Sequence, residues 1–119
     1  MPEIFKRTEA VASGEFVVVT TDAIEGHPVR EYLAIVAGEM VVEVPALRAQ
    51  NDSQRRPPSA TLLQRRLSEG RSRAISTMIR QARSIGATAI IAMEIRYTSL
   101  TGDGPNLIVV AVSGTAVTI

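Results

Sequence analysis

The spacing of apolar residues divides the chain into four predicted strands and one predicted helix. Apolar residues two positions apart, or in short β-branched runs, predict strands over residues 16–20, 29–44, 88–98 and 107–118. Apolar residues three and four positions apart predict a helix over residues 61–86. These elements predict an α+β protein of two layers, in which one long helix covers one face of an antiparallel sheet.

The predicted helix has sequence signals at both ends. Thr61 and Gln64 have the spacing of a capping box, which predicts that the helix begins at Thr61. Gly86 is typical of the residue just beyond a helix C-terminus. The apolar stripe between these ends consists of Leu67, Ala74, Ile75, Met78, Ala82 and Ile85. Gly70 costs roughly 1 kcal/mol relative to Ala inside a helix, so two shorter helices that break at Gly70 are the alternative.

The predicted strand over residues 29–44 changes the phase of its alternation near its middle. Its apolar positions are Val29, Leu33 and Ile35 in the first part and Met40, Val42 and Val44 in the second. Because side chains alternate with a period of two, a change of parity needs one extra residue. The pattern therefore predicts a β-bulge near Ala37 and Gly38.

The last two predicted strands form a β-hairpin around residues 101–106, which contain an Asp-Gly pair. We expect the helix to cover the side formed by Ile91, Met93, Ile95, Tyr97, Ile108, Val110 and Val112. The opposite side carries the apolar residues Ile90, Leu107, Val109 and Val117. Leaving them in water forgoes several kcal/mol, at roughly 25 cal/mol per Å² of apolar surface. We therefore predict that other copies of the chain cover this side in a closed homo-oligomer.

Length and composition limit the class of protein. A chain of 119 residues with 45% hydrophobic residues fits one domain, which we place at residues 16–119 after a loosely ordered arm at 1–15. The chain has no Cys and a single His, so disulfides, thiolate nucleophiles and Cys-based metal sites are excluded. It has no apolar stretch of about 18 residues and no N-terminal signal segment, so we expect a cytoplasmic protein without a membrane span.

Charge is segregated along the chain, although the net charge is only +1. Residues 1–47 carry a net charge of −5, residues 48–83 carry +7 and residues 84–119 carry −1. The predicted helix holds a basic stripe formed by Arg66, Arg73, Arg80 and Arg83. Such a stripe can contact a polyanion, but the lack of interleaved aromatic residues disfavours nucleic acid. The alternative is that the acidic and basic parts neutralise each other within or between subunits.

Several short segments of this sequence resemble the YbjQ-like family, whose usual label is heavy-metal-binding. The matching segments are Thr20-Thr21, Glu25-Gly26, Glu31-Tyr32, Gly38-Glu39, residues 81–87, residues 93–97 and residues 112–117. The resemblance covers residues 16–119 apart from a divergent segment at 45–68. It implies a β-α-β-β subunit of the dodecin-like group that assembles into a homo-oligomeric ring, typically a pentamer. Where family members such as YbjQ have Cys after the Glu-Tyr pair, this chain has Leu33.

The chain offers few residues for chemistry. Soft metals prefer thiolate, thioether and imidazole ligands. Met40, Met78 and Met93 fall on apolar faces, where we expect them in the core, and His27 lies in a Gly-His-Pro turn. We therefore predict no metal ligands, no cofactor and no catalytic residues. A hard ion held by carboxylates such as Asp22, Glu25 and Glu94 is an alternative with no further support.

The residues expected to contact a ligand or a neighbouring subunit are Thr20, Thr21, Glu25, Glu94, Ser113 and Thr115. Within this set, Glu94 is expected to pair with Arg96, Thr115 or a neighbouring subunit. The sequence thus predicts a non-enzymatic homo-oligomer, with a pentamer favoured, that binds a metal ion or small ligand or acts as a scaffold. The alternative function is a polyanion-binding or nucleic-acid-binding oligomer that uses the Arg-rich helix face.

Overall fold

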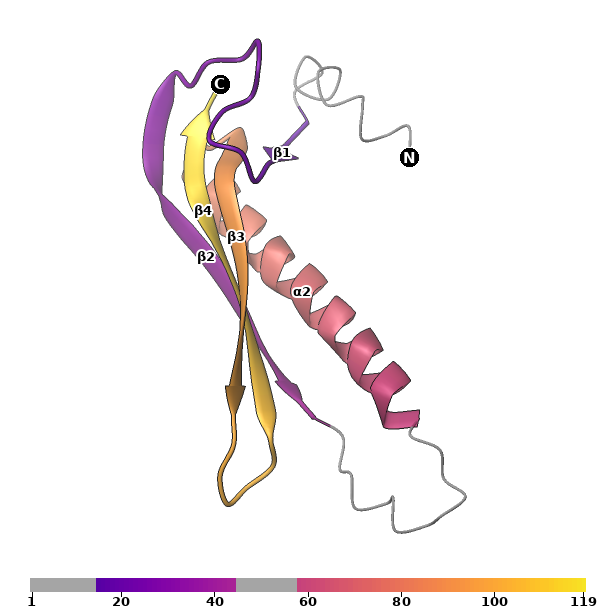
Figure 1. Ribbon diagram of the computed structural model, residues 1–119. Helices are drawn as coiled ribbons and strands as arrows, with labels where there is room; N and C mark the ends of the chain where they lie inside the picture. The colour runs from indigo at the N-terminus through magenta and orange to yellow at the C-terminus, as the bar shows by residue number, and fades with distance from the viewer. Residues whose placement is uncertain (1–14, 45–57) are drawn as a thin grey trace.

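The computed structural model describes residues 15–44 and 58–119, and it confirms an α+β fold (Figure 1). Its elements are β1 (Val17–Val18), β2 (Glu31–Glu43), α2 (Pro58–Ser84), β3 (Ala89–Leu100) and β4 (Leu107–Thr118). The strands form one sheet in the order β1-β3-β4-β2, and α2 crosses one face of this sheet. No helix in the described residues is long and apolar enough to cross a membrane. Residues 1–14 of the predicted arm and residues 45–57 lie outside the described residues.

The sheet is mixed, which corrects the expectation of an antiparallel sheet in a β-α-β-β subunit. Strand β1 pairs with β3 in parallel, whereas the pairs β3–β4 and β4–β2 are antiparallel. The element order is therefore β-β-α-β-β. The strand predicted over residues 16–20 keeps only Val17 and Val18, although the carbonyls of Val19 and Thr21 still accept hydrogen bonds from β3.

Helix α2 is continuous through Gly70, so the predicted single helix is confirmed and the alternative of a break at Gly70 is wrong. A Cβ added at Gly70 would lie 2.9 Å from Cγ2 of Val42, which explains why the close packing of helix and sheet requires glycine here. The helix begins three residues before Thr61, so the predicted capping box is also wrong. At the other end Gly86 has φ +88°, and the N–H groups of Gly86 and Ala87 donate to the carbonyls of Arg83 and Ala82. This is a Schellman motif, as Gly86 predicted.

The core lies between α2 and the sheet. Ala74, Met78 and Ala82 of the predicted apolar stripe are fully buried, and Leu67 and Ile75 are partly buried against the same cluster. Ile85 was predicted in this stripe but is 45% exposed, because it follows the last helical residue. The sheet contributes the buried residues Val36, Val42, Ile90, Val110, Val112 and Ala116. Each fully buried large side chain contributes about 1.5–3 kcal/mol relative to an exposed one. Met40, Met78 and Met93 all pack in this core, as predicted.

The bulge predicted at Ala37 and Gly38 lies elsewhere. The register of β2 against β4 shifts between Tyr32 and Ala34 and is regular through Ala37 and Gly38. Gly38 has a different role, because an added Cβ would overlap the carbonyl oxygen of Ala74 in α2. The glycine therefore permits the close approach of the helix backbone to the strand. The change of phase in the sequence is real, but it arises four residues earlier than predicted.

A second register shift lies in β3, between Ile91 and Glu94, and Ala92 within it has φ +56°. A bulge moves the following side chains to the other face of the sheet. Ile90 consequently belongs to the core under α2, whereas Ile91 faces away from it, which reverses the prediction for both residues. Met93 and Ile95, beyond the bulge, pack on the helix side as predicted.

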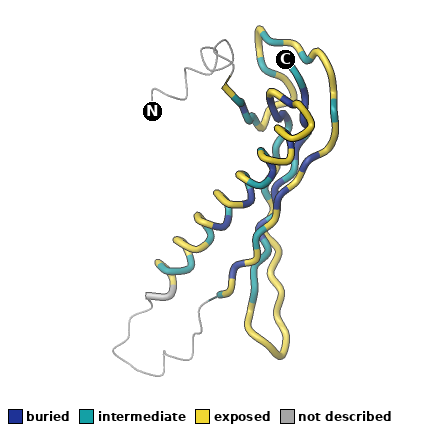
Figure 2. Tube along the Cα trace, turned by 180° about the vertical axis from the view of Figure 1, so that it is seen from behind, coloured by how far each residue is buried: buried dark blue, intermediate teal, exposed yellow. Residues whose placement is uncertain are grey.

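The sheet face away from α2 is covered at one end by the chain itself. Val17, Ala89, Ile91 and Val117 form a second buried cluster there, which we call the covered end. The loop from β1 to β2 supplies the partly buried residues Val19, Ile24 and Val29 that pack against it. The prediction that Val117 and Ile90 need a cover from another copy is therefore wrong. Figure 2 shows that the far end of the β3–β4 hairpin is exposed instead.

Candidate functional site

Three of the predicted contact residues share one surface. Ser113 and Thr115 lie on β4 and Glu94 lies on β3, directly opposite Ser113. Side chains of residues directly opposite each other in an antiparallel pair lie on the same face. Nη2 of Arg96 lies 3.4 Å from Oε1 of Glu94, so the pair predicted for Glu94 is present. Because both side chains are mostly exposed, the pair contributes little to stability.

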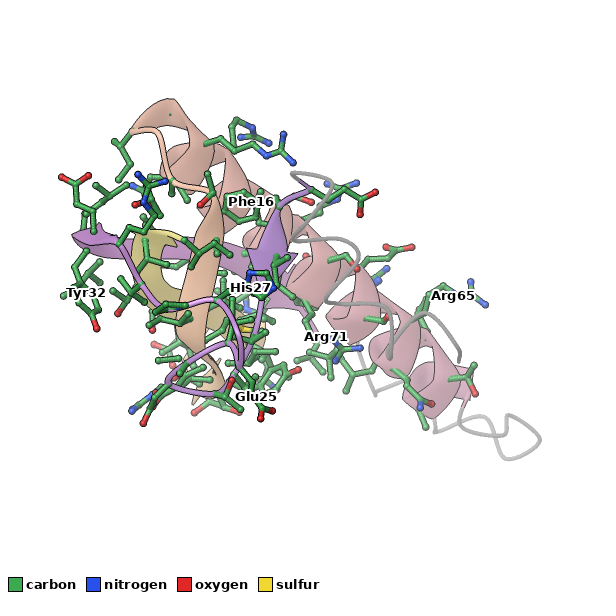
Figure 3. The ribbon with its side chains drawn as sticks, turned by 90° about the horizontal axis from the view of Figure 1, so that it is seen from above. Phe16, Glu25, His27, Tyr32, Arg65 and Arg71 are labelled. Atoms are coloured by element: carbon green, nitrogen blue, oxygen red, sulfur yellow. The ribbon has the colours of Figure 1, made fainter. Side chains whose placement is uncertain are left out.

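The other three predicted contact residues lie on the loop between β1 and β2. Thr20, Thr21 and Glu25 are all exposed. Oγ1 of Thr21 donates to the carbonyl of Ala23 at 2.7 Å, and the carbonyl of Thr21 accepts a hydrogen bond of 2.8 Å from the N–H of Ala92. The first bond is internal to the loop, and the second anchors the loop to the β3 bulge. Figure 3 shows Glu25 and His27 on this loop, away from Arg65 on α2.

Beyond the covered end, the sheet surface away from α2 has no covering element in the described residues. We call this surface the open sheet face. It comprises Ile35, Ala37, Glu39, Val41 and Glu43 of β2, Leu107, Val109, Ala111, Ser113 and Thr115 of β4, and Glu94, Arg96, Thr98 and Leu100 of β3. Ile35 is 81% exposed and Val41 is 57% exposed. Apolar side chains of the edge strand β2 therefore lie in water, which marks a surface suited to association.

The outer edge of β2 is partly closed by side chains of α2. The N–H of Ala37 donates to Oε1 of Gln81 at 2.9 Å, and Nη1 of Arg66 donates to the carbonyl of Glu43 at 3.1 Å. Both bonds satisfy backbone groups that would otherwise be free to pair with another strand. Among the described residues, β3 is paired at its outer edge only at its beginning, by β1 and the segment that follows it. The second half of β3 is therefore an open strand edge.

The Arg residues of α2 fall into two groups. Arg66 bonds the Glu43 carbonyl, Arg71 donates to the hydroxyl of Tyr97 at 3.0 Å, and Cζ of Arg83 lies 5.2 Å from the centre of the Phe16 ring. The second group comprises Arg65, Arg73 and Arg80, which are exposed and make no ion pair within the described residues. Glu69 lies four residues before Arg73 on α2, but the two side chains form no ion pair. Only this second group is available for an anionic partner.

Two clefts flank the first half of α2. One, of about 240 Å³, lies on the β2 side between Met40, Glu43, Arg66 and Arg73. The other, of about 540 Å³, lies on the β3 side and is lined by Thr61, Gln64, Arg65, Leu67, Ser68, Glu69, Arg71 and Tyr97. The charged lining of the first cleft is two Arg and two Glu, which include Glu69, and that of the second cleft is two Arg and one Glu. Only the second cleft has more guanidinium than carboxylate groups, which suits a carboxylate or a phosphate.

The described residues do not fit a soft metal ion. They contain no group of three or more His, Cys, Asp or Glu side chains that are arranged to hold a metal. The whole chain lacks Cys, and the three internal methionines are packed in the core under α2. Soft metals need thiolate or several thioether and imidazole ligands. A heavy-metal site therefore has no ligand set in this part of a single copy.

The cover provided by the loop between β1 and β2 was missed in the sequence. A signal was present, because Ile24 is an apolar residue in a segment otherwise typical of a turn, between the predicted strands that contain Val19 and Val29. The contacts of Gln81 and Arg66 with the β2 edge had no such signal. A polar residue on the flank of a helix is equally consistent with exposure to solvent.

Comparisons with known proteins agree on one family. The YbjQ family model, described as "Putative heavy-metal-binding", matches residues 16–119. A UPF0145 protein of Geobacillus kaustophilus is 38% identical over 104 residues, which cover 85% of this chain and 95% of that protein. A UPF0145 protein of Clostridium kluyveri is 34% identical over 105 residues, covering 87% and 98% of the two chains.

A solved structure shows the same fold. It is a protein of unknown function of the DUF74 family from Pediococcus pentosaceus, and it matches with a TM-score of 0.56. The match covers 86% of this chain and 95% of that chain at 14% sequence identity. At this level of identity the likeness concerns the fold alone.

Proposed function

This chain belongs to the YbjQ family, and from that premise we propose that it is a homo-oligomeric, non-enzymatic module that binds a small ligand or scaffolds a partner. A ring of identical subunits, with five as the expected number, is the proposed working form. The open sheet face is the surface through which the subunits associate.

The observation that supports this proposal is the exposure of Ile35 and Val41 on the open sheet face. Burying apolar surface gains roughly 25 cal/mol per Å², so a contact over this face contributes several kcal/mol to association. Soluble homo-oligomers are mostly closed and symmetric, and a shared sheet face is a surface that every copy provides.

Light scattering coupled to size-exclusion chromatography tests the proposal. At low micromolar concentration the mass should be a whole multiple of 12.8 kDa, and five copies are expected. Substituting Ile35 by Lys should lower that mass while the circular dichroism spectrum stays unchanged. The matched control is Tyr32→Lys, which changes an exposed residue beside the covered end. A folded wild-type particle of 12.8 kDa contradicts the proposal.

The proposal includes no catalytic residue and no metal ion. Ser113 and Thr115 have no His or Cys close by in the sheet, and their small side chains suit a close contact between subunits. Native mass spectrometry of the assembled protein with Zn²⁺ or Cu²⁺ should show no stoichiometric adduct at micromolar ion. A stable adduct would require ligands contributed by several subunits. We also propose a cytoplasmic location, which cell fractionation tests.

A second candidate function is polyanion binding through the basic stripe of α2. The observation that favours it is that Arg73 and Arg80 are exposed and lack carboxylate partners within the described residues. If the stripe binds polyanions, the protein should stay on heparin at low salt and elute as salt rises. Replacing Arg73 and Arg80 by Gln should abolish retention, whereas Arg96→Gln, on the open sheet face, should not.

A further inference from the structure

We propose that each subunit contact joins the open sheet face of one copy to the basic outer surface of α2 in the next copy. The charged residues of this helix surface are Arg65, Arg73 and Arg80. This inference rests on the proposed homo-oligomer and specifies how its subunits meet. The contact is heterologous, since each copy contributes two different surfaces. A repeated contact of this kind produces a ring when the rotation closes.

The two surfaces carry opposite charge. Helix α2 holds six Arg and one Glu. The open sheet face holds Glu39, Glu43, Glu94 and Arg96, and the last two of these pair with each other. Glu39 and Glu43 make no ion pair within the described residues. Each surface therefore has unpaired charges that the other surface can neutralise.

Charge also excludes the two symmetric alternatives. In a dimer of open sheet faces, the unpaired Glu39 and Glu43 would meet the same acidic surface of the other copy. In a dimer of helix surfaces, Arg65, Arg73 and Arg80 would face a second set of Arg residues. Like charges that face each other across an interface oppose association. Only the pairing of helix surface with sheet face brings together opposite signs.

Helix α2 is long enough to span the open sheet face, and its Arg side chains can cover the apolar residues there. A helix of 27 residues is about 40 Å long at about 1.5 Å per residue. The open sheet face spans nine residues of β2 (35–43) and nine of β4 (107–115), about 30 Å at about 3.3 Å per residue, so α2 is long enough to lie across it. The methylene groups of Arg can lie over Ile35 and Val41 while the guanidinium groups reach the neighbouring carboxylates. This arrangement covers the apolar residues without an apolar helix surface.

Three of the six Arg residues are free to make this contact. Arg66, Arg71 and Arg83 already contact groups of their own copy, and each of these contacts supports the local fold. Arg65, Arg73 and Arg80 make no such contact within the described residues. Arg73 and Arg80 are seven residues apart, so they lie on the same flank of α2, two turns from each other. They are the residues whose charge the test should reverse.

A charge-reversal series tests the inference. One variant combines Glu39→Arg with Glu43→Arg, and the other combines Arg73→Glu with Arg80→Glu. Each variant alone should raise the concentration at which the assembly dissociates by at least tenfold. The chain with all four substitutions should assemble again, because the signs match once more. Asp103→Arg, in the exposed hairpin turn, is the control and should leave assembly unchanged.

The outcomes separate this inference from the proposed function. A monomeric wild-type chain overturns both. A wild-type oligomer that neither double variant weakens overturns only the head-to-tail contact, as does a four-substitution chain that stays dissociated although its circular dichroism spectrum is native. If Arg73→Glu with Arg80→Glu abolishes heparin retention but leaves assembly intact, the stripe is a polyanion surface and the inference is wrong. Restored assembly in the four-substitution chain, with salt sensitivity in the wild type, supports it.

Discussion

The sheet face away from α2 is covered by the chain itself at one end and exposed at the other end. At the covered end Val117 and Ile91 are buried, because the loop between β1 and β2 folds back over them. At the open end Ile35 and Val41 have no cover from the described residues. The same strand, β4, passes through both ends with an unbroken alternation. The difference shows that one copy completes the core at one end only, so substitutions at the two ends should affect different processes.

Val117→Asp should have the largest effect on the stability of the subunit. A carboxylate in the covered end would have no partner among the apolar residues of its cluster, so burying it should cost about 3–5 kcal/mol of unfolding free energy. Urea denaturation followed by circular dichroism measures this loss. If the variant unfolds at the same urea concentration as the wild type, the loop between β1 and β2 does not bury Val117 in the covered end.

Gly38→Ala should have the next largest effect and concerns the helix side of the same strand. The new Cβ would overlap the Ala74 carbonyl, so the helix must move away from the sheet at a cost of about 1–3 kcal/mol. Urea denaturation again provides the measurement. Ala37→Ser changes the adjacent residue, on the open sheet face, and should change the unfolding free energy by less than about 0.5 kcal/mol. Equal losses in the two variants would contradict the close contact at Gly38.

Gln81→Ala should destabilise the subunit by about 1 kcal/mol, because it removes the hydrogen bond to the Ala37 N–H. It also exposes a backbone group at the β2 edge, so the protein should aggregate faster on warming. Hydrogen exchange of the Ala37 amide measures the first effect and static light scattering the second. Ser76→Ala, on the exposed surface of α2, is the control. Unchanged exchange at Ala37 would show that Gln81 does not protect this edge.

Ile35→Lys should have the smallest effect on the stability of the single subunit, below about 0.5 kcal/mol, because this side chain is mostly in water. Its effect should appear as lost assembly. Measuring urea unfolding at two protein concentrations separates the stability of the subunit from the effect of assembly, since only the wild type should gain stability with concentration. If the unfolding free energy of the wild type does not depend on protein concentration, the exposed end of the sheet face does not mediate assembly.

Much of the architecture could be predicted from local patterns in the sequence. The hairpin around residues 101–106, the helix end at Gly86 and the burial of Ala74, Met78 and Ala82 follow from turn chemistry and spacing, and all are confirmed. These features depend on residues close together in the chain. The Glu94–Arg96 pair is confirmed for the same reason, since both residues lie on one strand.

The errors share a different origin. Ile90 and Ile91 were placed on the wrong faces because the bulge at Ala92 depends on hydrogen bonds with the β1 end, which is far away in sequence. Gly38 was read as a bulge signal, although its partner is the helix backbone at Ala74. In both cases a single residue type has two physical explanations, and only the packed neighbour distinguishes them.

Residue types and their spacing were enough to establish the α+β class, the strand and helix content, the segregation of charge and the absence of thiol chemistry. These properties follow from residue type and spacing, which are local. The packed fold was needed to show which half of the sheet face is covered, which Arg residues of α2 already have a partner and which apolar side chains remain in water. Those properties depend on contacts between segments far apart in the chain, and the free energy of such contacts comes from burial that local patterns do not define.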